Sequence, residues 1–288
     1  MLQDCKLKLE VSEENQWVKN YIILRKEDNI EIGWCKLKTI TKEEAGITYS
    51  INEKYRRQGY GTEAVKLMMM DITKNINPKR ILAKVDERNI GAWRVIEKVG
   101  FNNTGVSWDE EEKAILRQYV FINYNIRKAE MKDVKTLGAI HANTWKICYS
   151  NIVPKEVLDN ITPEKRECYF KRSIKENIGQ TYIIENNNIL GLITIDRNRD
   201  KDLPYNCGEI WGIYIHPDHW GKGAGTRLLS WAVKNLMEKG YEDVCLWVLE
   251  DNLKARTFYE NMGFKWDGSE KSITLGKELK EIRYRLKA

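Results

Sequence analysis

Arg56-Arg57-Gln58-Gly59-Tyr60-Gly61-Thr62 and Trp220-Gly221-Lys222-Gly223-Ala224-Gly225-Thr226 are two glycine-rich segments, and each leads into a stretch with helical spacing. A second pattern follows both of them: Asn89-Ile90-Gly91-Ala92 with Gly100-Phe101, and Asn252-Leu253-Lys254-Ala255 with Gly263-Phe264. The Asn precedes the Gly-Phe pair by 11 residues both times, and it follows the last loop glycine by 28 or 27 residues. Two composite patterns at matching spacing predict a duplicated domain.

Length and composition agree with a two-domain soluble protein. The 288 residues suggest about two domains, and 42% hydrophobic with 31% charged residues is ordinary for globular chains. No apolar run approaches the roughly 20 residues of a membrane span. The segment Met1-Leu2-Gln3-Asp4-Cys5-Lys6 lacks a secretory apolar region, so we expect a cytoplasmic protein without membrane partners.

The net charge of +6 is spread along the chain and not gathered in blocks. With no recognised nucleic-acid motif, we expect no nucleic-acid partner. A mildly basic surface also suits a polyanionic small ligand such as a nucleotide cofactor. The six cysteines form no Cys-x-x-Cys pair and there are three histidines, so we expect no metal site.

Periodicity and turn residues predict mixed strands and helices in both halves. In the first half we expect strands at 21–24, 30–35, 47–51, 81–85 and 113–121, with helices at 62–76 and 89–99. In the second half we expect a strand at 124–127, helices at 131–147 and 163–176, and a hairpin of 182–185 with 190–195 before the glycine segment.

The fold class that we predict is α/β (mixed α+β), with two tandem domains at 1–122 and 123–288. Each domain has a central, mostly antiparallel sheet flanked by helices. The second half has about 40 more residues ahead of its hairpin, and these hold its two early helices. The first domain therefore lacks the early helices.

A glycine-rich turn before a helix presents unpaired backbone N–H groups and the positive end of the helix dipole. Such a turn predicts a phosphate-binding site, because glycine lets the backbone approach the anion closely. Neither segment ends in Gly-Lys-Ser/Thr, which excludes a P-loop. Neither fits the three-glycine Rossmann fingerprint with its later acidic residue.

The combined pattern resembles the GNAT family of acyl-CoA-dependent N-acyltransferases, whose loop reads Arg/Gln-x-x-Gly-x-Gly/Ala. Arg56-x-x-Gly59-x-Gly61 matches fully, and Trp220-x-x-Gly223-x-Gly225 departs at the leading basic position. The later family pattern of Asn, Ala, Tyr and Gly-Phe is complete in the second half. In the first half Ile96 stands at the Tyr position. The resemblance covers nearly the whole chain as two tandem domains.

The resemblance implies that acetyl-CoA lays its pyrophosphate on the glycine loop and its pantetheine arm along the strand before it. The implied cofactor-binding residues are Ile213, Tyr214, Ile215, Trp220, Gly221, Lys222, Gly223, Ala224, Gly225, Thr226, Asn252 and Ala255, with Arg56, Arg57, Gln58, Gly59, Tyr60, Gly61, Thr62 and Asn89 in the first half. An amine would then attack the thioester directly in a ternary complex.

The resemblance also implies two catalytic residues in the second half. Glu209 opens the strand where the family often places a base. Tyr259 holds the position of the acid that protonates the sulfur. Aligning the glycine loops without gaps puts Ala45 opposite Glu209, and Ile96 replaces the Tyr. We therefore expect the second domain to be the acetyltransferase and the first to be non-catalytic, with its CoA binding left open.

The resemblance implies that the acceptor is a primary amine on a small molecule, peptide or protein, and the sequence does not say which. Aromatic residues that would line its cleft are Trp145, Tyr149 and Trp211, with Tyr214 on the same strand. Each of these is as readily an ordinary core residue. Two other functions stay open: both domains are catalytic, or the protein is a non-catalytic acetyl-CoA sensor or scaffold. The oligomeric state is also open.

Overall fold

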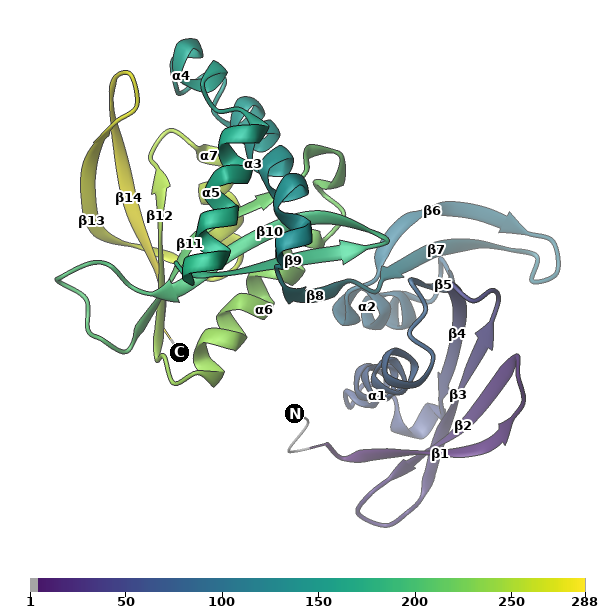
Figure 1. The fold of residues 1–288 in the computed structure, drawn as a ribbon. Coiled ribbons are helices and arrows are strands. Elements are labelled where there is room, and N and C mark those ends of the chain that lie inside the picture. The colour runs from purple at the N-terminus through teal and green to yellow at the C-terminus, as the bar shows by residue number, and fades with distance from the viewer. Residues whose placement is uncertain (1–4, 288) are drawn as a thin grey trace. The chain divides into compact units, whose positions relative to one another are not determined.

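The computed structural model describes residues 5–287, and the chain separates into two compact units, Met1–Asn123 and Tyr124–Ala288 (Figure 1). Residues 1–4, on which part of the expectation of no secretory segment rests, lie outside the described residues. Within residues 5–287 each unit carries a seven-stranded sheet with helices against it. The predicted fold class of two mixed α/β domains is confirmed.

The first unit is an antiparallel sheet with one parallel pair of strands. The strand order is β1-β2-β3-β4-β5-β7-β6, and β4 with β5 is the parallel pair. A parallel pair needs a long crossover, which the 3-10 helix η1 (Glu53–Tyr55) and helix α1 (Tyr60–Asn75) supply. The strands are β1 (Leu7–Glu14), β2 (Val18–Arg25), β3 (Glu31–Thr39), β4 (Glu44–Ile51), β5 (Arg80–Asp86), β6 (Asn102–Asp109) and β7 (Ala114–Ile122).

The helices of the first unit follow the predicted spacing. Helix α1 turns Val65, Met68 and Ile72 into the core, each of them fully buried. Helix α2 (Ile90–Val99) ends at Gly100, which adopts φ 105° as its C-terminal cap.

The second unit repeats this arrangement. Its strand order is β13-β14-β12-β11-β10-β9-β8, and β11 with β12 is again the parallel pair among the described strands. The strands are β8 (Asn125–Lys128), β9 (Gln180–Asn186), β10 (Asn188–Arg197), β11 (Cys207–Ile215), β12 (Asp243–Leu249), β13 (Lys265–Thr274) and β14 (Glu278–Lys287). The crossover consists of the 3-10 helix η3 (Pro217–His219) and α6 (Ala224–Glu238), and α7 (Leu253–Asn261) follows β12.

The early helices separate the two units, as predicted. In the second unit the 3-10 helix η2 (Met131–Asp133), α3 (Val134–Cys148), α4 (Lys155–Asp159) and α5 (Pro163–Glu176) lie between β8 and β9. In the first unit residues 15–17 alone connect β1 to β2. Figure 1 shows α3 and α5 packed beside each other against the sheet.

The two faces of the second sheet carry different cores. Ile193, Ile210 and Ile215 pack with α6, whereas Leu192 and Ile183 pack with α3 and α5. Successive residues of a strand point to opposite faces, so α6 covers one face and α3 with α5 covers the other. We call the face that α3 and α5 cover the helical-hairpin face.

Strands β1 and β6 and helix α4 are among the elements that were not predicted from the sequence. Strand β6 has almost no buried position, so it lacks the apolar alternation by which strands are recognised. Helix α4 has five residues, which is too short to show a helical period.

Candidate active site

The backbone of the second glycine segment is shaped to present N–H groups at the start of α6. Gly223 is the N-cap of α6 with φ 83°, and Gly221 has φ 72°. A Cβ on Gly223 would meet no atom within 4 Å, so the left-handed backbone, and not crowding, favours glycine here. The N–H groups of the next three residues have no intrahelical acceptor, which makes this end of α6 a site for an anion.

The first glycine segment has the same backbone. Gly59 caps α1 with φ 84°, and Arg57 adopts φ 62° at the place of Gly221. A residue with a Cβ in this left-handed conformation raises the free energy of the folded chain by roughly 1–2 kcal/mol, and the first loop has the same shape despite this strain at Arg57. In both segments the residue after the cap, Tyr60 or Ala224, turns its side chain into the core. The side chains exposed around the two loops are Arg56, Arg57, Gln58, Lys222 and Thr226.

Trp220 makes the same hydrogen bond as the arginine that it replaces. Its Nε1 donates to the carbonyl oxygen of Ile215 at 2.7 Å, and Arg56 Nε donates to the carbonyl oxygen of Ile51 at 2.9 Å. Ile215 and Ile51 are the last residues of the preceding strands. Lys254, at the start of α7, places its Nζ 3.7 Å from the Trp220 ring and restores a positive charge beside the loop.

In both units the parallel strands pair over only part of their length. The β11–β12 ladder ends at Ile210 with Leu246, and the β4–β5 ladder ends at Ile47 with Ala83. Residues 211–215 therefore continue toward the glycine loop without a ladder partner on the β12 side. The predicted cofactor-contacting residues Ile213, Tyr214 and Ile215 all lie in this stretch.

A bulge in β11 decides which side chains share the helical-hairpin face. The β10–β11 register shifts by one residue between Thr194 and Ile195, which leaves Trp211 as the extra residue. A Cβ on Gly179 would approach the Trp211 ring within 2.8 Å, and Tyr214 packs with the α3 and α5 cluster. Strict alternation would send Trp211 and Tyr214 to opposite faces, so the bulge brings both to the face of Glu209.

The β3–β4 pair has no register shift, which corrects the gap-free alignment of the two halves. Glu209 pairs with Cys245 in its parallel ladder, and Gly46 pairs with Leu82 in the other. Counting from Asn252 and Asn89, Cys245 and Leu82 are equivalent. Gly46, and not Ala45, therefore takes the place of Glu209.

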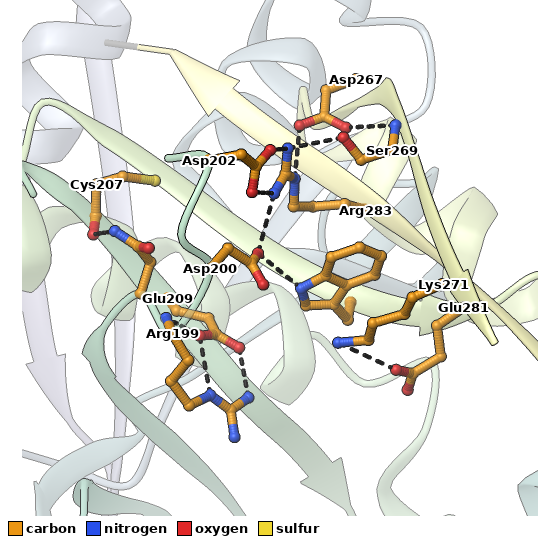
Figure 2. Close-up of polar contacts among 12 residues, drawn as sticks. Arg199, Asp200, Asp202, Cys207, Glu209, Asp267, Ser269, Lys271, Glu281 and Arg283 are labelled. Atoms are coloured by element: carbon orange, nitrogen blue, oxygen red, sulfur yellow. Dashed lines mark hydrogen bonds and ion pairs between the residues drawn. The ribbon is translucent and has the colours of Figure 1, made fainter. Parts of the chain in front are cut away.

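Glu209 is buried, and its carboxylate is held by Arg199 (Figure 2). The guanidinium of Arg199 contacts both carboxylate oxygens, and the Arg199 backbone N–H donates to one of them at 3.0 Å. Arg199 lies 4.5 Å from the Trp211 ring centre. Its side chain is 55% exposed, on the loop between β10 and β11, so it can leave the carboxylate without breaking the core.

Tyr259 is buried on α7 within the core under the sheet. Burial raises its pKa well above the ordinary value, and the nearby Tyr214 and Cys148 raise it further. The phenol therefore keeps its proton across the physiological range. Asn252 caps α7, because its side-chain oxygen accepts the Ala255 N–H at 3.2 Å.

The first unit has the same cap without the tyrosine. The Asn89 side chain accepts the Ala92 N–H at 3.1 Å, and the backbone angles of the two caps agree within a few degrees. The side chain one helical turn further on is Ile96, which is fully buried. The cap explains the shared Asn by helix geometry, and in the second unit the Asn252 side chain also hydrogen-bonds with the Tyr149 hydroxyl.

Three of the predicted aromatic residues gather around a buried histidine. Trp145 of α3 and Tyr149, the C-cap of α3, lie 4.6 Å apart, and His141 of the same helix lies 5.7 Å from Trp145 and 4.4 Å from Tyr214. Trp211 does not join this group, since it packs beneath Arg199. Burial, and then the charge of Arg166, lower the pKa of His141 to about 3, so the ring is neutral at physiological pH.

Three arginines of the site were not found from the sequence: Arg166, Arg199 and Arg283. Figure 2 shows Arg283 of β14 surrounded by Asp200, Asp202 and Asp267, at 3.1, 2.6 and 2.7 Å. Asp200 also accepts the Trp247 indole N–H at 2.9 Å. These contacts fix the β10–β11 loop over the edge of β12. The signal in the sequence is weak, since Arg283 and Asp202 are 81 residues apart.

A cavity of about 440 Å³ opens beside this loop. It is lined by Arg197, Asn198, Arg199, Asp200, Leu203 and Tyr205. Across residues 5–287, no three His, Cys, Asp or Glu side chains gather in a way that could hold a metal ion. In the same range, no helix has the length and apolar character needed to cross a bilayer.

Two family models match the chain, one in each unit. The model described as the acetyltransferase (GNAT) family matches residues 145–264, and the acetyltransferase (GNAT) domain matches residues 2–102. Together they cover most of the chain and both glycine segments. The chain therefore belongs to the GNAT family of acetyltransferases.

Individual relatives match about half of the chain. An uncharacterized N-acetyltransferase of Bacillus subtilis, YuaI, is 26% identical over 159 residues, which are 54% of this chain and 89% of the relative. The spermidine N(1)-acetyltransferase of Thermoplasma acidophilum is 25% identical over 159 residues, 52% of this chain and 94% of the relative. A solved structure of the PaiA N-acetyltransferase from Thermoplasma acidophilum with coenzyme A is 24% identical, covers 58% of this chain and all of the other, and has a TM-score of 0.45.

Proposed function

We propose that the second unit transfers an acetyl group from acetyl-CoA to a primary amine, by direct attack in a ternary complex. The observation that carries this proposal is a combination found in the second unit only. The open stretch of β11 begins at Trp211, two residues after Glu209, and leads toward the start of α6, and a buried, protonated Tyr259 packs in the core beside it. When bound, acetyl-CoA supplies the activated acetyl group.

The residues of the glycine segment fit the phosphates of this donor. Three backbone N–H groups at the start of α6 face outward, and the cap Gly223 puts no Cβ in the way. Lys222, Arg227 and Lys254 supply positive charge nearby. The unpaired backbone of residues 211–215 fits an extended chain that adds to β11 as a strand would.

Tyr259 is the proposed acid. A phenol with a raised pKa holds its proton until a stronger base forms nearby, and the departing thiolate of the donor is such a base. Glu209 is the proposed base, acting directly or through a water molecule. For this role Arg199 must turn away from the carboxylate, and the exposed position of Arg199 allows that movement.

The first unit is proposed to bind acetyl-CoA without transferring from it. It keeps the loop, the cap and the open strand, but Ile96 and Gly46 stand where the second unit has Tyr259 and Glu209. A purely sensory role for the second unit has less support, because Trp220 makes the hydrogen bond of the arginine that it replaces.

The acceptor is proposed to be an amine of a small molecule or of a peptide or protein. The spermidine acetyltransferase among the relatives acts on an amine of the first kind. Neither nucleic acid nor a membrane is proposed as a partner.

The test is calorimetric titration with acetyl-CoA, together with acetyl transfer to a panel of amines. Gly223→Asp and Gly223→Asn form a matched pair, since both side chains tolerate the left-handed backbone and only Asp repels phosphate. We expect Gly223→Asp to weaken binding to the second unit at least tenfold more than Gly223→Asn, and to abolish transfer.

The same pair at Gly59 tests the first unit. Gly59→Asp should remove one of two binding sites and leave transfer intact. If Gly223→Asp transfers acetyl groups like the unaltered protein, the assignment of catalysis to the second unit is wrong. If the protein acetylates none of the amines, the result would support a non-catalytic acetyl-CoA sensor.

A further inference from the structure

Arg166 on α5 is a partly buried arginine without a counter-charge. None of the ion pairs formed by residues 5–287 includes it, and its Nε is buried with no hydrogen-bond partner. Three other buried or partly buried arginines of the second unit form ion pairs: Arg283 with three aspartates, Arg285 with Asp243, and Arg127 with Asp133 and Glu185. Burying a charge without a partner is costly, so its retention calls for an explanation.

The packing of Arg166 leaves the edge of its guanidinium free. The group lies 4.3 Å from the ring centre of Tyr169 and 5.6 Å from that of Phe170. Stacking on a ring satisfies the face of the guanidinium, while its N–H donors lie in the plane and point past the ring. Arg166 is thus held in place with donors that the described residues do not use.

A chain of ring contacts places Arg166 on the helical-hairpin face, at the aromatic cleft. Phe170 lies 6.0 Å from His141, and His141 lies 4.4 Å from Tyr214 of β11. The charge of Arg166 contributes to the lowered pKa of His141, which agrees with this placement. Tyr214 belongs to the open stretch of β11, so Arg166 borders the space where an acceptor would meet the donor.

Carboxylates gather around Arg283 in the same unit. Arg283 contacts three aspartates, Asp200, Asp202 and Asp267, and its single charge neutralises one of them. The second unit therefore has a group of carboxylates around Arg283 and, on α5, a guanidinium without a carboxylate partner.

We propose that Arg166 binds a carboxylate of the acceptor, which is therefore an aminocarboxylate and not a simple polyamine. The carboxylate accepts the unused guanidinium N–H donors, and the amine faces the open stretch of β11. This inference rests on the proposed acetyl transfer to an amine. A polyamine such as spermidine has no group for Arg166 and would bring further positive charge against it.

The experiment compares matched acceptors on the full-length protein. Acetyl transfer is measured with the standard L-amino acids and with the amines formed by their decarboxylation, such as phenylalanine and phenethylamine. We expect the amino acid of at least one pair to have a KM at least tenfold lower than its amine. Arg166→Met should raise that KM about 10- to 100-fold, change the KM of the amine little, and leave kcat within a few-fold.

Arg172→Met is the control, because it removes the same charge from an exposed position of the same helix. Arg166→Lys should retain part of the preference. Arg166→Met should also melt no lower than the unaltered protein, whereas a structural arginine would lower the melting temperature. Equal KM values within every pair, or a preference that survives Arg166→Met, would overturn the inference while the proposed transfer stands.

A binding measurement separates the two proposals. If no amine is acetylated, the proposed function fails, and the amino acids are then titrated calorimetrically into protein saturated with coenzyme A. Binding that is lost in Arg166→Met and kept in Arg172→Met supports the carboxylate site on its own. Absence of such binding overturns it.

Discussion

The two units of this chain share the backbone of their glycine segments and differ in the helices and side chains that the second unit adds. Both have a left-handed glycine cap before the crossover helix and an asparagine that caps the next helix. Both also link that helix to the last strand of the unit by a hydrogen bond from a tyrosine hydroxyl to a glutamate: Tyr119 to Glu97, and Tyr284 to Glu260. The shared features are those that shape the backbone of a cofactor site.

The main differences are features that only the second unit has. The second unit has the helices of residues 129–179, the Trp211 bulge, Glu209 and Tyr259, and the first unit has none of these. The comparison teaches that the glycine segments with their helix caps, which we call the frame, can be kept while the features proposed for the acceptor are absent. The frame depends on backbone geometry, whereas the proposed acceptor features depend on side chains and on the extra residue Trp211.

The comparison is tested most strongly at the tyrosine. Tyr259→Phe should lower kcat about 100-fold or more, because the leaving sulfur loses its proton donor. The dissociation constant of acetyl-CoA should change little, since only the hydroxyl is removed. The measurement is kcat by steady-state kinetics and affinity by calorimetry. As control, Ile96→Leu in the first unit should leave both values unchanged, and a Tyr259→Phe protein with normal kcat would remove the catalytic assignment.

Mild acid should act through a histidine in the second unit only, because all three histidines of the chain lie there. His141 has a pKa of about 3 when folded, below its ordinary 6.5, so the unfolded chain binds the extra proton between these values. The contribution of neutral His141 to the free energy of unfolding is therefore fully present above about pH 6.5. It decreases as the pH drops, by up to about 1.4 kcal/mol per pH unit.

The measurement is urea unfolding at several pH values from 7 to 4, compared with His141→Phe. The variant should lose this part of the pH slope, and the carboxylates that titrate in both proteins cancel in the comparison. Identical slopes for the two proteins would contradict a neutral buried His141.

The smallest effect on stability is expected when the second glycine segment is given the arginine of the first. Trp220→Arg should cost less than about 1 kcal/mol of unfolding free energy, since Arg56 shows that an arginine can donate to the same carbonyl. Trp220→Phe keeps a ring and loses the donor, so it should be the more destabilising of the two, by about 1 kcal/mol. Chemical denaturation measures both. Trp220→Arg as the more damaging change would show that the two loops are not equivalent.

The glycine segments and helix caps could be predicted from the sequence, because each depends on residues that are close together along the chain. Glycines at the caps, asparagine before each helix and the spacing between them gave the duplication and the confirmed fold. The helix at residues 163–176 was predicted with its observed bounds, because Thr162 and Pro163 begin it in a characteristic way.

The acceptor face could not be read in the same way, because it depends on contacts between distant segments. The bulge at Trp211 is set by how β10 pairs with β11, and a gap-free alignment of the halves hides it. The partner of Glu209 is an arginine in an irregular loop, and Arg166 attracts notice only because a carboxylate is missing beside it. The roles of Glu209, Tyr259 and the aromatic residues remain predictions.

The bulge has a consequence for anyone who would rebuild the first unit as an enzyme. Ala45 is fully buried in the core against α1, so a glutamate there would be driven into apolar surroundings. Gly46 is the position whose Cβ has only ordinary contacts, and it points to the open side of the sheet. Even so, a glutamate at Gly46 and a tyrosine at Ile96 would lack the added residue that turns the rest of the strand. Point substitutions alone therefore cannot interconvert the two units, and their divergence includes an insertion or deletion of one codon.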